Sequence, residues 1–142
     1  MMPCGTDGET MPPKLLDTTL LIDHAASRPA AVALVRRLFE ETGEIFTCDA
    51  VVAEACSRGS DDELAAIAAM VQALEYVATH PDAARWAGEA RRRGGRTSPR
   101  TLGDALIASV AWSLGATVVT RNPDDFVRMG VPVLAYEADE PA

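Results

Sequence analysis

The chain has 142 residues, of which 48% are hydrophobic and 24% charged, and this balance predicts one globular domain with an apolar core. No apolar run approaches the roughly 18 residues that cross a bilayer, and the first residues lack a signal-peptide pattern, so we expect a cytoplasmic protein. The net charge of −8 argues against nucleic-acid binding through a wholly basic surface.

Residues 1–13 lack hydrophobic periodicity and are predicted to be a disordered leader, and residues 137–142 a flexible tail. The expected elements follow in chain order: a strand over 14–18, helices over 20–28 and 30–41, a strand over 44–48, helices over 49–58 and 60–74, a strand over 76–79, helices over 81–93 and 101–114, and strands over 116–120 and 131–134. This alternation predicts one α/β domain over residues 14–136, with a mostly parallel sheet covered on both faces.

Acidic and amide side chains recur near the predicted strand ends. Asp17 ends the first strand, and Glu54 lies in the helix after the second. Asp104 begins the helix that leads into the strand over 116–120, and Asn122 and Asp125 follow that strand. Because parallel strands end at one edge of a sheet, we expect these side chains to converge there.

Each of these residues also has a purely structural interpretation. Asp17 has the position of a helix N-cap, and Glu54 that of an exposed helical acid. Thr101 and Asp104 have the spacing of a capping box, and the run from Asn122 to Asp125 resembles a helix start. The functional interpretation therefore depends on their joint placement.

A cluster of carboxylates without histidine or thiolate partners predicts a hard cation. Like charges at close range repel, so several acids stay ionised together only when a cation compensates them. Oxygen ligands suit Mg²⁺, with Mn²⁺ as the alternative. Such a cation positions a phosphodiester and polarises the attacking water, so the cluster indicates phosphodiester hydrolysis.

The same residues lie in motifs that resemble a known family. The run Leu15–Asp23 is similar to the opening motif of PIN domains, and Val51–Glu54 to their second acidic motif. Residues 104–111 and 114–126 are very similar to the third and fourth motifs of VapC-type toxins. The resemblance implies a three-layer α/β/α fold, a Mg²⁺-dependent endoribonuclease that cleaves tRNA or rRNA, a homodimer and a cognate antitoxin.

The resemblance also implies roles for individual residues. Asp17, Glu54 and Asp104 take the three acidic positions, and either Asp125 or Asn122 completes the metal site. Two hydroxyl residues, Thr18 and Thr120, match positions that orient metal or water. An alternative is a weakly catalytic PIN module that binds RNA or a partner protein without cleavage.

Between residues 85 and 100 the chain carries six arginines and a single acid. We expect Arg92, Arg93 and Arg96 to contact substrate phosphates, or an acidic antitoxin segment that mimics them. The structural alternative is that these arginines lie on a solvated helix end and pair with acids of the chain itself.

Overall fold

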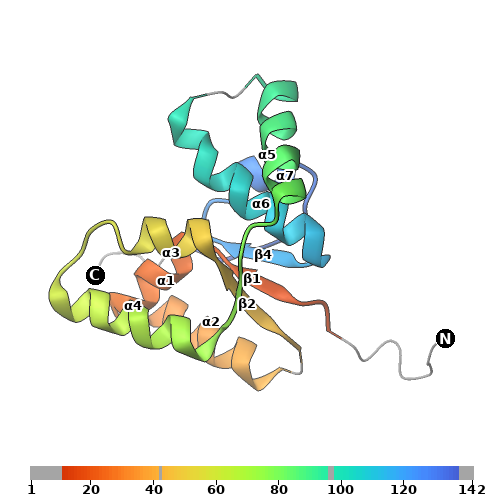
Figure 1. Cartoon of the computed structure of the whole chain (residues 1–142). Coiled ribbons are helices and arrows are strands. Elements are labelled where there is room, and N and C mark those ends of the chain that lie inside the picture. The colour runs from red at the N-terminus through yellow and green to blue at the C-terminus, as the bar shows by residue number, and fades with distance from the viewer. Residues whose placement is uncertain (1–10, 42, 96–97, 138–142) are drawn as a thin grey trace, which may run out of the picture.

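The computed structural model describes residues 11–41, 43–95 and 98–137, in which strands and helices alternate along the chain (Figure 1). Residues 1–10 of the predicted leader therefore lie outside the described residues. The elements are β1 (Lys14–Leu16), α1 (Thr18–Ala25), α2 (Pro29–Glu40), β2 (Ile45–Cys48), α3 (Asp49–Ala55), α4 (Asp61–Ala73), β3 (Glu75–Val77), α5 (Pro81–Arg93), the 3₁₀ turn η2 (Pro99–Thr101), α6 (Leu102–Leu114), β4 (Thr117–Thr120), α7 (Asp124–Arg128) and β5 (Val133–Ala135).

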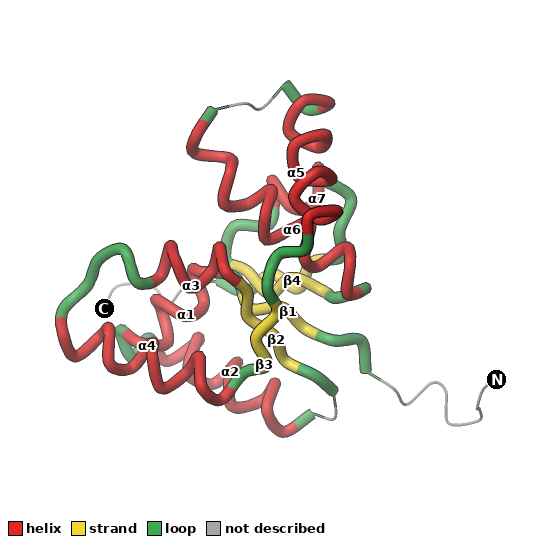
Figure 2. Tube along the Cα trace, in the orientation of Figure 1, coloured by secondary structure: helices red, strands yellow, loops and turns green. Residues whose placement is uncertain are grey.

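The five strands form one sheet in the order β3-β2-β1-β4-β5, and every neighbouring pair is parallel. Helices α1, α2 and α4 lie on one side of this sheet, and α5 and α6 lie on the other (Figure 2). This arrangement confirms the predicted three-layer α/β/α fold. In the part of the chain that the structure describes, no helix is long and apolar enough to span a bilayer.

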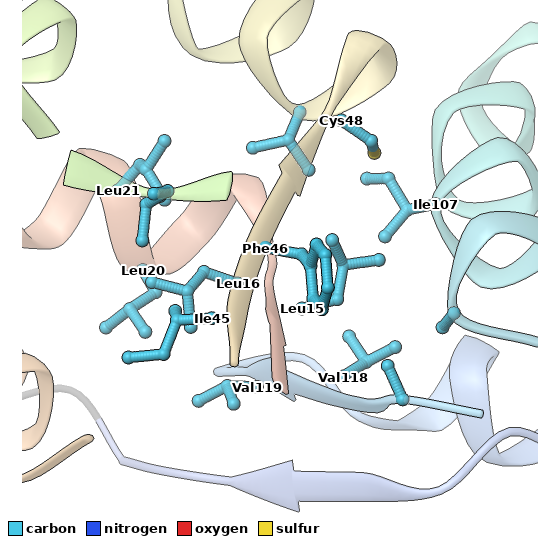
Figure 3. Packing of buried hydrophobic residues seen from close by; sticks show 14 of the residues in the cluster. Leu15, Leu16, Leu20, Leu21, Ile45, Phe46, Cys48, Ile107, Val118 and Val119 are labelled. Atoms are coloured by element: carbon cyan, nitrogen blue, oxygen red, sulfur yellow. The ribbon is translucent and has the colours of Figure 1, made fainter. Parts of the chain in front are cut away.

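The central strands β1 and β4 are buried on both faces (Figure 3). Leu15 is in register with Val118, and this pair lies on the side of α6. Leu16 is in register with Val119, and this second pair lies on the side of α1. Burial on both faces is why β1 has apolar residues at successive positions, as in other parallel sheets.

The strand order has a switch point between β1 and β4. The chain leaves β1 toward β2 on one side, whereas β4 and β5 extend the sheet on the other side. Ligands of open α/β sheets bind at the carboxyl ends of the strands beside such a point. The residues that directly follow the two strands are Asp17 and Arg121.

Two helices have different bounds in the structure from those that the sequence predicted. Helix α1 begins at Thr18, two residues earlier than expected, and α3 ends at Ala55, before the expected end at residue 58. Asp49 is the first residue of α3 and not its N-cap. Its carboxylate accepts hydrogen bonds from the Tyr76 hydroxyl and, at 2.9 Å, from the backbone N of Thr79. These partners are distant in sequence, so local pattern could not reveal them.

Helices α5 and α6 pack against each other. Trp86 and Trp112 stack across this pair with their ring centroids 5.6 Å apart, although the side chain of Trp112 is 54% exposed. By contrast, the large apolar side chains of α4, Ile67 and Met70, are buried in the domain's own core.

Thr47 in β2 is fully buried, and its hydroxyl is the one buried side-chain polar group of the described residues that has no hydrogen-bond partner. We expect Thr47→Val to raise the free energy of unfolding by about 1 kcal/mol, because valine keeps the shape and removes an unsatisfied group. The matched control is Thr120→Val, which removes an equally buried hydroxyl that donates to Asp17. Urea unfolding should show the control losing stability, and a Thr47→Val variant that also loses stability would contradict this account.

Candidate active site at the carboxyl edge of the sheet

The site begins where β1 and β4 end. Asp17 is 3% exposed, and its backbone N donates to Val119 O at 2.9 Å. Thr120, the last residue of β4, donates through Oγ1 to Asp17 Oδ2 at 2.7 Å. Asp17 occupies the N-cap position of α1, as the sequence allows, but its side chain makes no capping hydrogen bond. Its carboxylate accepts instead from Thr120 at the end of β4 and, at 3.3 Å, from the Thr19 hydroxyl in α1.

The environment of Asp17 acts on its pKa in both directions. Burial raises the pKa above its usual range, and the negative charge of Glu54 adds to the rise. Hydrogen bonds from Thr120 and Thr19 oppose that shift by stabilising the carboxylate. The carboxylate therefore lies in a place where a cation would favour its charged form.

Glu54 reaches the same place from α3, which packs against both α1 and α6. The hydroxyl of Thr18 donates to Glu54 Oε1 at 2.8 Å. This bond joins the first residue of α1 to the last turn of α3, and it orients the acid. Glu54 is therefore not merely a solvated acid on an exposed helix face.

Asp104 lies in the first turn of α6 and faces the other carboxylates. Burial, followed by the charge of Asp17 and a hydrogen bond with the Asp125 carboxyl, raises the pKa of Asp104 to about 7. The predicted capping box does not form: the Thr101 side chain makes no capping hydrogen bond, and the Thr101 backbone N donates to Ser98 O at 3.1 Å. Asp104 is thus held among acids that disfavour its charge.

A cavity of about 320 Å³ brings most of the predicted site together. Its lining includes five predicted site residues: Asp17, Thr18, Glu54, Asp104 and Asn122. The position of Asn122 is fixed by its backbone N, which donates to the Thr120 hydroxyl at 3.0 Å. Asp125 does not line this cavity and joins the cluster through Asp104.

Asp104 and Asp125 also line a second cavity, of about 360 Å³, together with three arginines: Arg91, Arg93 and Arg128. Of the arginines predicted to bind substrate, Arg93 is therefore beside the carboxylates. Arg92 is exposed and does not line this cavity. Arg96 lies outside the described residues.

Sequence reasoning missed a supporting cluster of Asp23, Arg121 and Tyr136. Asp23 is 3% exposed, and both of its carboxylate oxygens accept from Arg121 Nη1 at 3.1 Å. The Tyr136 hydroxyl donates to the same carboxylate at 2.7 Å. The cluster anchors the segment after β4, which carries Asn122, to α1. The sequence signal that could have indicated this cluster was Asp23 itself, a charged residue within the apolar helix α1.

The donor set at this edge fits a hard divalent cation. Carboxylate and amide oxygens are the ligands that Mg²⁺ and Mn²⁺ prefer. Over the described ranges, no three His, Cys, Asp or Glu side chains form a ready-made ligand group. Mg²⁺ usually keeps several waters and binds through one or two carboxylates, so a looser arrangement of acids suits it. Burial and, after it, repulsion from neighbouring carboxylates raise the pKa of Asp104, and such a cation would relieve the repulsion.

Comparison with known proteins places these observations in a family. The PIN domain model matches residues 14–132. Ribonuclease VapC19 from Mycobacterium tuberculosis is 35% identical over 115 residues, which cover 80% of this chain and 91% of that relative. The chain therefore belongs to the PIN domain family. Within that family it is similar to the VapC ribonucleases.

Solved structures of the same fold agree. The crystal structure of VapBC2 from Rickettsia felis, bound to a promoter DNA fragment, matches with a TM-score of 0.72 and 20% identity, covering 88% of this chain and 99% of that one. Mycobacterium tuberculosis VapC20, titled a sarcin–ricin loop cleaving toxin, matches with a TM-score of 0.67 and 17% identity, covering 83% and 95%. At these identities the matches show the fold alone.

We expect the metal-free protein to lose stability between about pH 4 and pH 7 through Asp104. Its folded-state pKa is about 7 against an ordinary value of 3.8, so between these values the folded state keeps a proton that the unfolded chain has released. Rising pH therefore favours the unfolded state over that window. Asp104→Asn removes the titration, and the variant should gain stability over the wild type at pH 8, measured by urea unfolding in EDTA.

The control is Asp61→Asn, an exposed first-turn acid of α4 outside the site. This change should slightly destabilise the protein, because it removes a favourable interaction with the helix dipole. The account fails if Asp104→Asn also destabilises the metal-free protein at pH 8.

Proposed function

We propose that the protein is a divalent-metal-dependent endoribonuclease and the toxin of a type II toxin–antitoxin pair. The observation that carries the proposal is the convergence of Asp17, Glu54, Asp104 and Asp125 at the switch point of the sheet, where burial and like charges raise the Asp104 pKa to about 7. The similarity to Ribonuclease VapC19 supports RNA as the substrate. An intracellular RNA substrate also agrees with the predicted cytoplasmic location.

In this proposal Asp17 and Asp104 hold the cation, with either Asp125 or Asn122 completing the site, and the cation is Mg²⁺ or, alternatively, Mn²⁺. When bound, it would stabilise charge on the phosphate and make a water molecule more acidic. Through the 2.7 Å hydrogen bond Thr120 opposes the rise that burial causes in the pKa of Asp17. Thr18 orients Glu54, whose carboxylate faces the cavity and can accept a hydrogen bond from the attacking water.

The test is an RNA cleavage assay with purified protein, using tRNA and rRNA fragments with Mg²⁺, with Mn²⁺ or with EDTA. Asp104→Asn should lower cleavage by at least about 100-fold, since it removes a charge that acts on the transition state. In a parallel melting experiment, Mg²⁺ at about 100 times its Kd should stabilise the wild type by about 2.7 kcal/mol, and the variant much less.

Cleavage that persists in EDTA, or a fully active Asp104→Asn variant, would contradict the metal-site assignment. RNA binding without cleavage would instead favour the alternative, a PIN module that binds RNA or a partner without cutting. Asp61→Asn again provides the control, because it removes an acid of the same type outside the site.

We further propose that Arg92, Arg93 and Arg96 contact phosphates of the RNA or an acidic antitoxin segment. Arg93 has the most structural support, because it shares the second cavity with Asp104 and with another arginine, Arg128. Both side chains already lie near acids, at 3.9 Å from Glu89 and 3.8 Å from Asp125. These are long, partly exposed ion pairs, which contribute little and leave the arginines available to phosphate.

Single-stranded RNA binding should depend less steeply on salt when these arginines are removed. Each lost phosphate contact reduces the slope of log affinity against log salt by about 0.7. We expect this change for Arg93→Ala and Arg128→Ala, measured by fluorescence anisotropy in the Asp104→Asn background. Arg36→Ala, an exposed arginine on α2 in the opposite layer, should keep the parent slope. Equal slopes for all three variants would contradict the proposal.

The proposed protein partners are a cognate antitoxin and a second copy of the chain. Matching solved structures include VapBC complexes from Rickettsia felis and nontypeable Haemophilus influenzae, which supports an antitoxin. Ile67 and Met70 of α4 are buried in the domain's own core, so these two side chains are not available to a homodimer. Among the described residues, the large exposed apolar side chains are those of Ile22, Phe39, Tyr76, Leu102, Trp112 and Val127.

A further inference from the structure

We propose that Gly103 is a positioning residue whose missing side chain creates the space for the Glu54 carboxylate. A Cβ atom at residue 103 would lie 2.0 Å from Glu54 Oε2 and 2.7 Å from Glu54 Cδ. Both separations are far below any contact that real Cβ atoms make. The inference rests on the proposed function, because it concerns how one acid of that site is held.

The backbone gives no reason for glycine at this position. Gly103 is the second residue of α6 and is not among the described glycines with positive φ. A glycine within a helix is less favourable than an alanine, since it loses more conformational freedom on folding. Gly88 within α5 shows the contrast, because nothing lies within 4 Å of a Cβ placed there.

The Glu54 carboxylate is bound by α1 on one side and lies over the backbone of α6 on the other. Its Oε1 accepts the hydrogen bond from Thr18 at 2.8 Å, and its Oε2 occupies the space above Gly103. Gly103 directly precedes Asp104, so the first turn of α6 carries one acid of the site and receives another. An alanine would push the end of the Glu54 side chain out of this space and away from Thr18.

Such a change should affect the site more than the fold. The displaced atoms belong to the far end of a flexible, exposed side chain, so the cost to folding is limited to the hydrogen bond between Thr18 and Glu54. Gly103→Ala should lower ribonuclease activity at least 10-fold and reduce the rise in melting temperature on adding Mn²⁺. Gly88→Ala is the matched control, a glycine-to-alanine change within a helix, and it should alter neither quantity.

A conservative variant distinguishes positioning from general damage. Glu54→Asp shortens the side chain by one methylene and withdraws the carboxylate from residue 103. The double variant Gly103→Ala/Glu54→Asp should therefore lose less activity, and less of its Mn²⁺ response, than the two single changes predict together. Strict additivity in the double variant, or a Gly103→Ala variant that behaves like Gly88→Ala, would overturn the proposal.

Melting of the metal-free protein tests the same contact without activity. Gly103→Ala should raise the melting temperature more in a Glu54→Ala background, where the space is empty, than in the wild type. If the wild type fails to cleave RNA, the proposed function fails, and this comparison still decides the role of Gly103. An equal effect in both backgrounds would show that residue 103 does not contact Glu54.

Discussion

The side chains of Asp17 and Thr120 meet at the ends of two neighbouring parallel strands, and their 2.7 Å hydrogen bond organises the rest of the site. It stabilises the charged form of a carboxylate whose pKa burial raises. The Thr120 hydroxyl also accepts from the backbone N of Asn122, so the same oxygen sets the course of the chain after β4. Glu54 of α3 and Asp104 of α6 are then placed beside an Asp17 carboxylate whose position is already fixed.

Much of this arrangement followed from local sequence. The apolar run of β1 and the alternation of strands and helices predicted a parallel sheet, and a parallel sheet places Asp17 and Asn122 at one edge. Periodicity did not predict which capping patterns would form. The capping box of Ser60 and Glu63 is present, whereas the similar pattern at Thr101 is replaced by a bond to Ser98.

Other parts of the site needed contacts between distant residues. The Asp23 carboxylate, 98 residues from Arg121 and 113 from Tyr136 along the chain, is neutralised by the first and accepts a hydrogen bond from the second. Nothing near Asp23 in the sequence indicates either partner. The space between Gly103 and Glu54 is likewise a property of how α3 packs on α6. The residue types of one helix could not predict the shape of the space between two packed helices.

The stacked pair of Trp86 and Trp112 has a spectroscopic consequence. The chain has two tryptophans, and both belong to α5 and α6. Intrinsic tryptophan emission therefore reports the packing of these two helices, while the sheet half that carries β2 and β3 contributes none. The same helices bring Arg93 and Asp104 to one cavity. A ligand in this cavity that changes the packing of α5 against α6 would therefore change the wavelength and intensity of the tryptophan fluorescence.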